Sequence, residues 1–547
     1  MDLQRKFLFV VFLITSALIW RVWENEKITQ DAKTVKIIEQ MEIQNNKFID
    51  KAIENKYIVV KTDVLKIRIN KVGGDIDEAD LLVYNKNLYS KNPFRLLETG
   101  LDFVYQAQSG LTGPNGPDNP FNNNGKRPCY ATNSDYFELQ DNQDVLFIPM
   151  IFIGNDNVVY KKIYTVKRGK YSVDVKYSIQ NKTNSMLNIA FFGQLKQTAI
   201  VPKHRDTKTT NFALRTYRGA AYSSNENAYK KYSISDIKTE DLNLTTKGGW
   251  VAMLQQYFAV AWIPNGRENA IFYSAFLDNK YGVIGYKTIP LLIKPNSVFN
   301  YSSTLWIGPE IQSEMAKISS HLDLTVDYGW LWFISQPLFR LLKFIHNYVG
   351  NWGISIIIIT FILRGIMYPL TKAQYTSMAK MRLLQPKLIE IRERFNNDKQ
   401  RMSQEMMTIY KSEKVNPLGG CLPLLIQMPI FLALYYMLMS SVELRHASFF
   451  GWVKDLSAQD PYYILPVLMG LSMFVIQKIS PSTSTEPMQQ KIITYIPIIF
   501  TIFFLWFPSG LVLYYVISNL VTIIQQQIIY KSLENRGLYN RDKKNRK

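Results

Sequence analysis

Five apolar segments near the C-terminus constrain the fold of this 547-residue chain more than any other feature of its sequence. They cover residues 354–370, 421–439, 462–476, 492–507 and 511–529. Apolar stretches of this length favour helices that cross a bilayer. A helix of about 15 residues rises only about 23 Å, whereas the hydrocarbon core of a bilayer is about 30 Å thick. The shortest segments therefore predict a locally thinned membrane or flanking side chains that reach out of it.

A sixth apolar segment lies at the N-terminus. It begins after the basic pair Arg5 and Lys6 and ends in the aromatic residues Trp20 and Trp23, which are typical of membrane interfaces. No small-residue cleavage site follows this segment. Residues 1–23 are therefore predicted to be a retained transmembrane signal anchor, and a cleaved signal peptide is the alternative.

With this anchor the chain has six predicted spans, the second at residues 351–370 and the other four within residues 417–530. The loop at residues 371–416 carries ten Lys or Arg and five Asp or Glu, and the tail at residues 531–547 carries seven and two. Because basic loops stay on the cytoplasmic side, we expect this loop, the tail and both termini in the cytoplasm. The long segment between the first two spans then lies in the periplasm, with residues 24–56 as a polar tether.

Residues 57–329 follow a different pattern, with a period of two. Residues 65–70 and 171–177 alternate between apolar and polar side chains, which is typical of half-buried antiparallel strands. The repetition of this pattern predicts an all-β sandwich domain, followed by a C-terminal helix. Residues 110–128 hold four glycines and four prolines and are predicted to form a long surface loop.

Two further helical features are predicted next to the membrane. Residues 330–350 are amphipathic and aromatic, which predicts a helix in the membrane interface; a helix that caps the β domain is the alternative. Residues 371–416 repeat Met, Leu and Ile at three- and four-residue steps on both sides of a turn at residues 396–398. This predicts a cytoplasmic helical hairpin. Its methionines either form an adaptable surface for apolar partners or pack the two helices together.

Arg364 is the residue with the strongest chemical implication, because it lies inside the second predicted span. Insertion scales put the cost of an arginine at the centre of a membrane helix at about 2.5–3.5 kcal/mol. Its guanidinium therefore needs water, an acid or a ligand. Thr360 lies four residues earlier and extends a polar stripe on the same helix face. The alternative is that Arg364 only reaches the cytoplasmic headgroups.

The other core spans contain no Asp or Glu to neutralise Arg364. They offer neutral polar side chains instead, namely Gln427, Gln477, Tyr515, Ser518 and Thr522. The last three lie at i, i+3 and i+7 and so share one helix face. This set predicts a water-filled, positively charged groove, and hydrogen bonds between helices are the alternative.

Composition excludes several other classes of protein. Two cysteines, Cys129 and Cys421, and four scattered histidines leave no basis for a disulfide scaffold or a Cys- or His-rich metal site. No Walker A sequence, GxSxG elbow or HExxH motif lies in a supporting context. We therefore predict neither catalytic residues nor a metal or other cofactor. The basic tail is predicted to meet anionic phospholipid or ribosomal RNA rather than DNA, and a solvated tail that only sets the topology is the alternative.

Three motifs are specific enough to indicate a family. Residues 354–369 (ISIIIITFILRGIMYP), residues 416–431 (NPLGGCLPLLIQMPIF) and residues 506–515 (WFPSGLVLYY) resemble the YidC membrane protein insertases. The resemblance covers essentially the whole chain, including the large periplasmic domain of the Gram-negative members. It implies a β-supersandwich in the periplasm and a five-helix core. In this family the core forms a hydrophilic groove that opens to the cytoplasm and to lipid.

The resemblance also implies which residues contact the substrate. The arginine of the family matches Arg364, and two polar contact positions match Thr360 and Tyr515. A slide of apolar contacts runs along the third to fifth spans. Its matching positions are Phe431, Met469 and Phe503. To the polar groove we add three residues from their helix faces, which are Gln427, Gln477 and Ser518.

Sequence and resemblance together predict an insertase and chaperone of the bacterial inner membrane, which inserts and helps fold nascent membrane proteins alone or with the SecYEG translocon. The ribosome, the signal-recognition receptor and anionic phospholipid are further implied partners. The positive groove attracts the acidic segment of a client, and partitioning of the client helix into lipid drives its release without ATP. A small-anion transporter or channel that uses the Arg364 pocket is one alternative. A sugar-active or sugar-binding protein that acts through its β domain is another.

Overall fold

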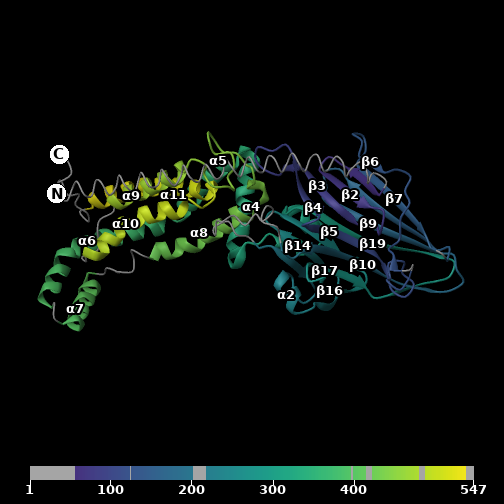
Figure 1. Ribbon diagram of the computed structural model, residues 1–547. Helices are drawn as coiled ribbons and strands as arrows, with labels where there is room; N and C mark the ends of the chain where they lie inside the picture. The colour runs from purple at the N-terminus through teal and green to yellow at the C-terminus, as the bar shows by residue number, and fades with distance from the viewer. Residues whose placement is uncertain are drawn as a thin grey trace.

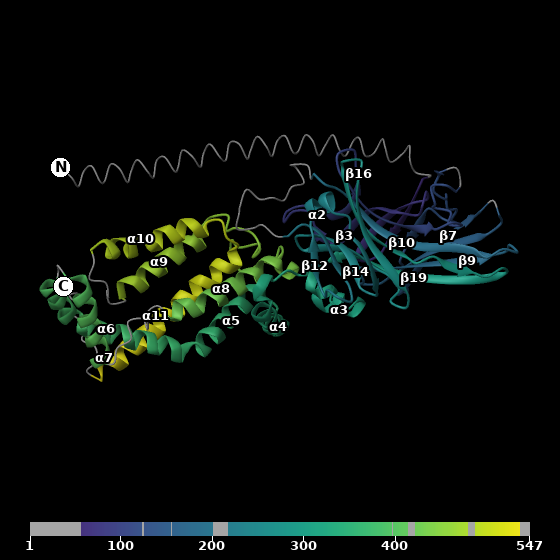
Figure 2. The same ribbon diagram turned by 90° about the horizontal axis from the view of Figure 1, so that it is seen from below.

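The fold has two parts, a β domain and a bundle of helices, as a computed structural model shows (Figure 1). The structure describes residues 56–122, 125–154, 156–200, 217–395, 398–413, 422–479 and 487–536. The predicted signal anchor, almost all of the tether and the end of the basic tail lie outside these residues. The helix α4 (Trp332–Val349) lies at the junction and runs across the direction of the other long helices (Figures 1 and 2).

The β domain consists of two mainly antiparallel sheets. The first has eleven strands in the order β13 (Asn243–Lys247), β16 (Asn269–Leu277), β17 (Tyr281–Thr288), β10 (Leu187–Thr198), β5 (Val104–Thr112), β4 (Pro93–Thr99), β3 (Ile76–Asn85), β2 (Leu65–Asn70), β1 (Tyr57–Lys61) and β6 (Tyr136–Glu138), with β18 (Leu291–Ile293) paired to β10. The second has eight, in the order β12 (Lys230–Tyr232), β11 (Gly219–Ser223), β14 (Trp250–Gln255), β15 (Phe258–Ile263), β19 (Ser297–Pro309), β9 (Ser172–Asn181), β8 (Val159–Lys167) and β7 (Val145–Ile153).

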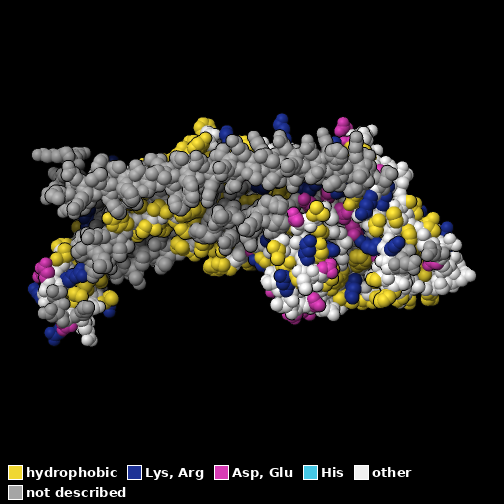
Figure 3. All heavy atoms as spheres, viewed as in Figure 1, with side chains coloured by type: hydrophobic (Ala, Val, Ile, Leu, Met, Phe, Trp, Pro, Cys, Tyr) yellow, Lys and Arg dark blue, Asp and Glu magenta, His cyan; other side chains and the backbone are white. Residues whose placement is uncertain are grey.

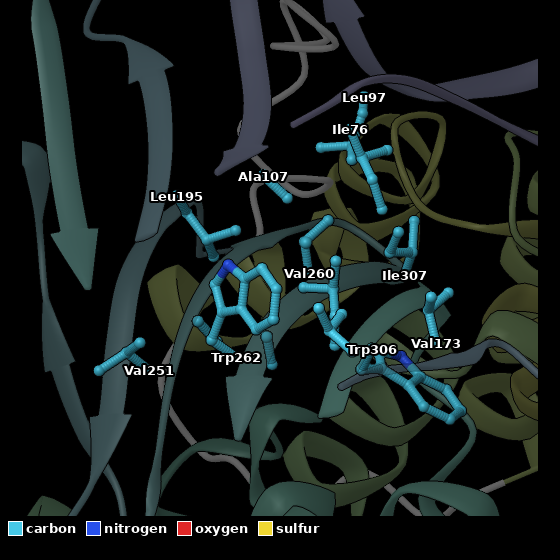
Figure 4. Close-up of a cluster of buried hydrophobic side chains, with 14 of the residues drawn as sticks. Ile76, Leu97, Ala107, Val173, Leu195, Val251, Val260, Trp262, Trp306 and Ile307 are labelled. Carbon is cyan, nitrogen blue, oxygen red and sulfur yellow. The ribbon is translucent and has the colours of Figure 1, made fainter. Parts of the chain in front are cut away.

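Apolar and polar side chains alternate along the strands, and the apolar ones form the core between the two sheets. In β2, Leu65, Ile67 and Ile69 are buried, and the residues between them are exposed or half-buried. Figure 4 shows Trp262 and Trp306 of the second sheet among apolar side chains from both sheets. Burial of such side chains contributes roughly 25 cal/mol per Å² of apolar surface. The predicted all-β sandwich is confirmed.

Part of the predicted surface loop at residues 110–128 is instead buried. Strand β5 continues to Thr112, and the side chain of Asp118 is 1% exposed. Its carboxylate accepts hydrogen bonds from the backbone N–H of Leu111 (2.9 Å) and from Nε of Arg127 (2.7 Å). The prediction was wrong here, because glycine and proline content does not show which charged residues of a loop pair with each other.

Lys162 of β8 is a fully buried cation close to this pair. Its Nζ donates to the carbonyl oxygens of Gly73 (3.0 Å), Gly74 (2.8 Å) and Ser109 (3.1 Å). Gly74 has a φ of +66°, and a Cβ there would lie 3.0 Å from the lysine side chain, so both the backbone conformation and the space favour glycine. Burial lowers the pKa of Lys162 to about 7, and the nearby Asp75 opposes the shift.

We expect Lys162→Met to destabilise the protein by about 2–4 kcal/mol, because it removes three hydrogen bonds to buried carbonyl groups. The carbonyl groups of Gly74 and Ser109 keep a second donor, which is Tyr164 for the first and Arg127 for the second. Scanning fluorimetry of the full chain in detergent would show this as a melting temperature several degrees lower. Lys161→Met is the matched control, since Lys161 is the exposed neighbour on the same strand. Equal melting temperatures for the two variants would contradict the role given to Lys162.

The helices follow the β domain in the chain, apart from one short helix within it. They are α2 (Ile234–Thr239), α3 (Gln312–Ile318), α4, α5 (Trp352–Ile366), α6 (Tyr368–Arg394), α7 (Lys399–Ser412), α8 (Leu422–Ser440), α9 (Ile464–Ile479), α10 (Pro487–Phe504) and α11 (Ser509–Glu534). The helix α4 buries one face against α5 and α8. Its other face exposes aromatic side chains, including Trp332 and Tyr348.

Two predicted span boundaries differ in the structure. The second predicted span, residues 351–370, breaks between α5 and α6, which meet at 59°. Pro369 lies in the first turn of α6, where the N–H that proline lacks would have no partner in the helix. Inside one continuous helix, the same proline would remove a hydrogen bond, so the break lies just before it. The helix α10 ends at Phe504, so Phe507 lies beyond the span in which it was predicted.

Within the described residues, α11 is long and apolar enough to cross a membrane by itself. The bent pair of α5 and α6 passes the same test as one span. Three shorter apolar helical stretches are described, Gln427–Ser440 in α8, Ile464–Ile479 in α9 and Thr494–Phe504 in α10. The six-span core therefore stays a prediction, and its first span lies outside the described residues.

The segment between α8 and α9 connects the helices to the β domain. Arg445 donates through Nη2 to the carbonyl oxygens of Asn85 (2.7 Å) and Lys86 (3.1 Å). Its guanidinium lies 5.5 Å from the ring centroids of both Phe94 and Phe258. Hydrogen bonds and cation–π contacts thus hold the two parts together.

A cavity of about 20 Å³ lies at the same junction, lined by residues of the β domain, by Asp327 and by Ser440 of α8. Glu310 faces this cavity and is 7% exposed. Burial, with a further contribution from the charge of Asp327, raises the pKa of Glu310 well above its ordinary value. Asp327 itself forms an ion pair with Lys231.

A group with a raised carboxyl pKa favours the folded state in its protonated form, so this stability is lost as pH rises above about 4.5. We expect Glu310→Gln to melt several degrees above the wild-type protein at pH 8 and close to it at pH 4.5. Melting temperatures of both proteins across this range test the expectation. Glu314→Gln is the control, because hydrogen bonds from Lys170 and Lys317 lower the pKa of Glu314. This substitution is therefore expected to lower the melting temperature at pH 8 rather than to raise it. Parallel curves for wild type and Glu310→Gln would refute the assignment.

Candidate functional site

Arg364 lies in the last turn of α5, where its side chain points at α11. Its Nε donates to Oγ of Ser518 at 2.7 Å, and its Nη2 contacts the same oxygen. Arg364 is 8% exposed and Ser518 is fully buried. Within the described part of the chain, no carboxylate forms an ion pair with Arg364; the groups around it include Tyr375, Tyr514 and Tyr515. The cation is therefore held by neutral partners.

The backbone of Arg364 is bound as well as its side chain. Gln525 of α11 donates through Nε2 to the carbonyl oxygen of Arg364 at 3.0 Å. This satisfies one of the carbonyl groups that the end of α5 leaves without a partner inside the helix. Gln525 was missed from the sequence, although it continues the row of Ser518 and Thr522 by one more step of three residues. Extending that row would have found it.

Thr360 shares the buried face of α5 with Arg364, as predicted from their spacing. Its hydroxyl donates to the carbonyl oxygen of Ile356 at 2.5 Å. Thr360 is fully buried. Its hydroxyl is therefore satisfied within its own helix, and the residue lies one turn from the guanidinium without bonding it.

Tyr515, predicted to line the polar groove, lies in an aromatic cluster. Its ring centroid is 5.1 Å from that of Phe431 and 5.0 Å from that of Phe504. The cluster joins α8, α10 and α11. Tyr515 thus lies between Arg364 and Phe431, one of the apolar residues predicted for the slide.

The other predicted residues are spread over three helices. Gln427 near the start of α8 and Gln477 at the end of α9 are half-buried, and the contacts of Arg364 and Ser518 include neither glutamine. Met469 of α9 is fully buried, whereas Phe503 of α10 is 40% exposed and packs on Phe507. The ring of Phe503 is therefore partly exposed, whereas the side chain of Met469 is not.

The methionines of the α6–α7 pair pack in two ways. Met381 and Met406 lie against Leu384 and Leu388 between the two helices. This favours the interpretation that they hold the pair together. Met407 is 49% exposed, however, so one methionine is available to a partner.

Two family models match the chain. The model of the YidC periplasmic domain matches residues 57–341, and that of the 60Kd inner membrane protein matches residues 344–536. The first of these alone covers more than half of the chain. The chain belongs to the YidC family.

Several solved structures are weakly similar to this chain. A YidC insertase crystal structure with the first transmembrane domain resolved is 20% identical, with a TM-score of 0.37, over 87% of this chain and 92% of that chain. A galactose mutarotase related enzyme from Lactobacillus acidophilus is 9% identical, with a TM-score of 0.30, over 46% and 97%. A galactose mutarotase-like protein from Lactobacillus casei is 6% identical, with a TM-score of 0.32, over 46% and 99%. The family assignment rests on the family models alone.

Membership of the YidC family gives the general function. YidC family proteins are membrane protein insertases rather than enzymes, so this protein is an insertase of the bacterial inner membrane whose clients are nascent membrane proteins. Its matched β domain is periplasmic. The predicted family, insertase activity and periplasmic β domain are confirmed.

We expect Ser518→Ala to destabilise this YidC protein by about 1.5–3 kcal/mol, because it removes a hydrogen bond to a charged group. The temperature of half-unfolding in detergent would fall accordingly. Ser412→Ala is the control, since Ser412 is exposed and its hydroxyl donates only to the carbonyl of Ile409. Equal stabilities of the two variants would mean that water replaces Ser518 without loss.

Proposed function

We propose that this YidC protein inserts its clients through a positively charged groove at the contact of α5 and α11. Arg364, Thr360 and Ser518 form its centre, and Gln427, Gln477 and Tyr515 extend its polar lining. Phe431, Met469 and Phe503 make up the apolar slide. The observation that carries this proposal is that, in the described residues, the Arg364 guanidinium is nearly buried and has only neutral partners.

A client acts on this centre by exchange of partners. An acidic residue in its translocated segment replaces Ser518 as the acceptor of the guanidinium. A charge-assisted hydrogen bond is about twice as strong as a neutral one, so the exchange favours binding. The client's apolar helix then moves past the slide into lipid, because burial yields roughly 25 cal/mol for each Å² removed from water. This sequence of steps requires no nucleotide.

Short helices assist the same process. The helix α5 has 15 residues and α9 has 16, which gives a rise of about 23 Å for α5 and about 24 Å for α9. Such helices match a bilayer thinner than the usual core of about 30 Å. A client segment therefore crosses a shorter apolar path.

The same proposal includes the membrane topology of the rest of the chain. Residues 1–23 form the first of six spans and residues 24–56 the tether, and residues 330–350 lie in the periplasmic interface. The hairpin at residues 371–416 and the tail at residues 531–547 face the cytoplasm. There they recruit clients, the ribosome, the signal-recognition receptor and anionic phospholipid, and the protein also works with the SecYEG translocon.

We expect Arg364→Ala to lower the insertion of clients with acidic translocated segments by about tenfold, the equivalent of about 1.4 kcal/mol. Clients with neutral segments are expected to change little, and Arg364→Lys to restore most of the insertion. Protease protection of labelled clients in proteoliposomes measures both. Arg340→Ala is the matched control, because Arg340 is an exposed residue of α4. An equal loss for acidic and neutral clients would overturn the charge attraction.

A further inference from the structure

Gln525 of α11 is a buried amide whose side chain reaches across to α5. It is 8% exposed, and its Nε2 donates to the carbonyl oxygen of Arg364 at 3.0 Å. Within the described residues, this is the only hydrogen bond of the Gln525 side chain, because its Oε1 accepts none. A substitution at Gln525 therefore removes one defined hydrogen bond, and that bond is made with Arg364.

The residue that Gln525 binds lies at the end of a helix. Arg364 is in the last turn of α5, three positions before Met367, where the helix breaks. The last carbonyl groups of a helix lack donors within it, and helix ends fray. Pro369, in the first turn of α6, has no N–H to offer them. The end of α5 therefore benefits from donors on other helices, and Gln525 supplies one.

Ser518 and Gln525 bind Arg364 at two different points. Ser518 accepts from the guanidinium at the tip of the side chain, and Gln525 donates to the backbone. The two residues are seven positions apart, which is about 10.5 Å along α11. An arginine bound at its tip alone leaves its backbone free to move, whereas contacts at both points fix the direction in which the side chain leaves α5.

The polar neighbours of Gln525 on α11 bind other groups. Thr522 donates to a carbonyl oxygen of its own helix at 2.7 Å. Asn519 donates to Ser472 of α9 at 2.9 Å and is 7% exposed. Asn519 is thus a buried amide that joins α11 to another helix as Gln525 does, but it bonds α9 rather than Arg364.

The surface over these helices is mainly apolar. Hydrophobic side chains make up most of the described surface that Figure 3 shows on the helices between the β domain and the end formed by α6 and α7. A charge among such helices takes its partners from neighbouring helices rather than from surface charges. The contacts with α11 therefore determine where the guanidinium of Arg364 lies.

We propose that Gln525 is a positioning residue for Arg364 and thereby sets how strongly the protein prefers clients with acidic translocated segments. Its bond to the carbonyl group keeps the guanidinium at the contact of α5 and α11, where the carboxylate of a client meets it. A charge-assisted hydrogen bond to a guanidinium depends on direction as well as on distance, so a displaced Arg364 binds an acidic segment more weakly. A neutral segment makes no such bond. This inference rests on the function proposed above.

The test compares Gln525→Leu with the wild-type protein in proteoliposomes, using two clients that differ only in whether the translocated segment carries Asp or Asn. Protease protection is expected to show about fivefold lower insertion of the Asp client and less than about twofold change for the Asn client, because a small displacement of a binding group costs factors of this order or more. Equal losses for the two clients would mean a purely structural role and overturn the proposal. Unchanged insertion of both clients would overturn it as well.

Asn519→Leu is the matched control. It removes a hydrogen bond of a similarly buried amide on the same helix, but this bond leads to α9. Any effect of this variant on insertion is expected to be the same for the Asp and the Asn client. A selective loss of the Asp client in Asn519→Leu would show that any weakening of α11 alters the preference, and it would overturn the specific role of Gln525.

A double-mutant cycle shows whether Gln525 acts through Arg364. Insertion of the Asp client by Arg364→Ala is expected to stay the same when Gln525→Leu is added, because the positioned group is already absent. A further loss of about fivefold in the double variant would mean that the two residues act independently. That result would contradict the positioning role.

Melting temperatures in detergent accompany these assays. Gln525→Met replaces Gln525→Leu if the latter melts well below Asn519→Leu, since methionine is unbranched, as glutamine is, and adapts to irregular spaces. The two proposals fail in different ways. A selective loss in Arg364→Ala without one in the Gln525 variant would overturn this inference alone. Equal effects on both clients in Arg364→Ala would overturn the charge attraction on which it rests.

Discussion

The need to satisfy one buried cation organises the helical part of this protein. Arg364 binds α11 twice, through its side chain to Ser518 and through its carbonyl to Gln525. A buried guanidinium or carbonyl group that is left without a partner costs several kcal/mol. The same constraint accounts for the polar row of α11, whose Asn519 donates to Ser472 of α9 at 2.9 Å. Polar contacts in this bundle therefore fix which helices are neighbours.

The identity of the partner matters as much as its presence. A carboxylate beside Arg364 would form a stable buried ion pair, and removing one member of such a pair costs about 3–5 kcal/mol. A serine hydroxyl satisfies the guanidinium without neutralising it. The charge is thus held without being neutralised, and the proposed insertion mechanism requires such a charge.

Sequence patterns predicted the β domain well and the helical site only in part. Alternation in β2 reports burial directly, and the spacing of Thr360 and Arg364 correctly placed both on one face of α5. The partners of Arg364 depend on which faces of α5 and α11 are turned toward each other. The residue pattern of a single helix does not determine this orientation. The same reason explains Met469, which is apolar and correctly placed on α9 but turned inward. Lys162 was not singled out from the sequence, because nothing in the pattern of its strand marks a lysine whose acceptors lie more than 50 residues earlier in the chain.

The break between α5 and α6 has a mechanical consequence. A single residue, Met367, separates the two helices, and Arg364 lies three positions before it. A linker of one residue keeps the first turn of α6 next to the last turn of α5, so the position of α6 constrains the end of α5 that carries Arg364. Tyr375 and Ala379 of α6 lie in one buried cluster with Ile529 and Tyr530 of α11. The helix α11 is therefore tied to both sides of the bend, through Arg364 before it and through Tyr375 and Ala379 after it.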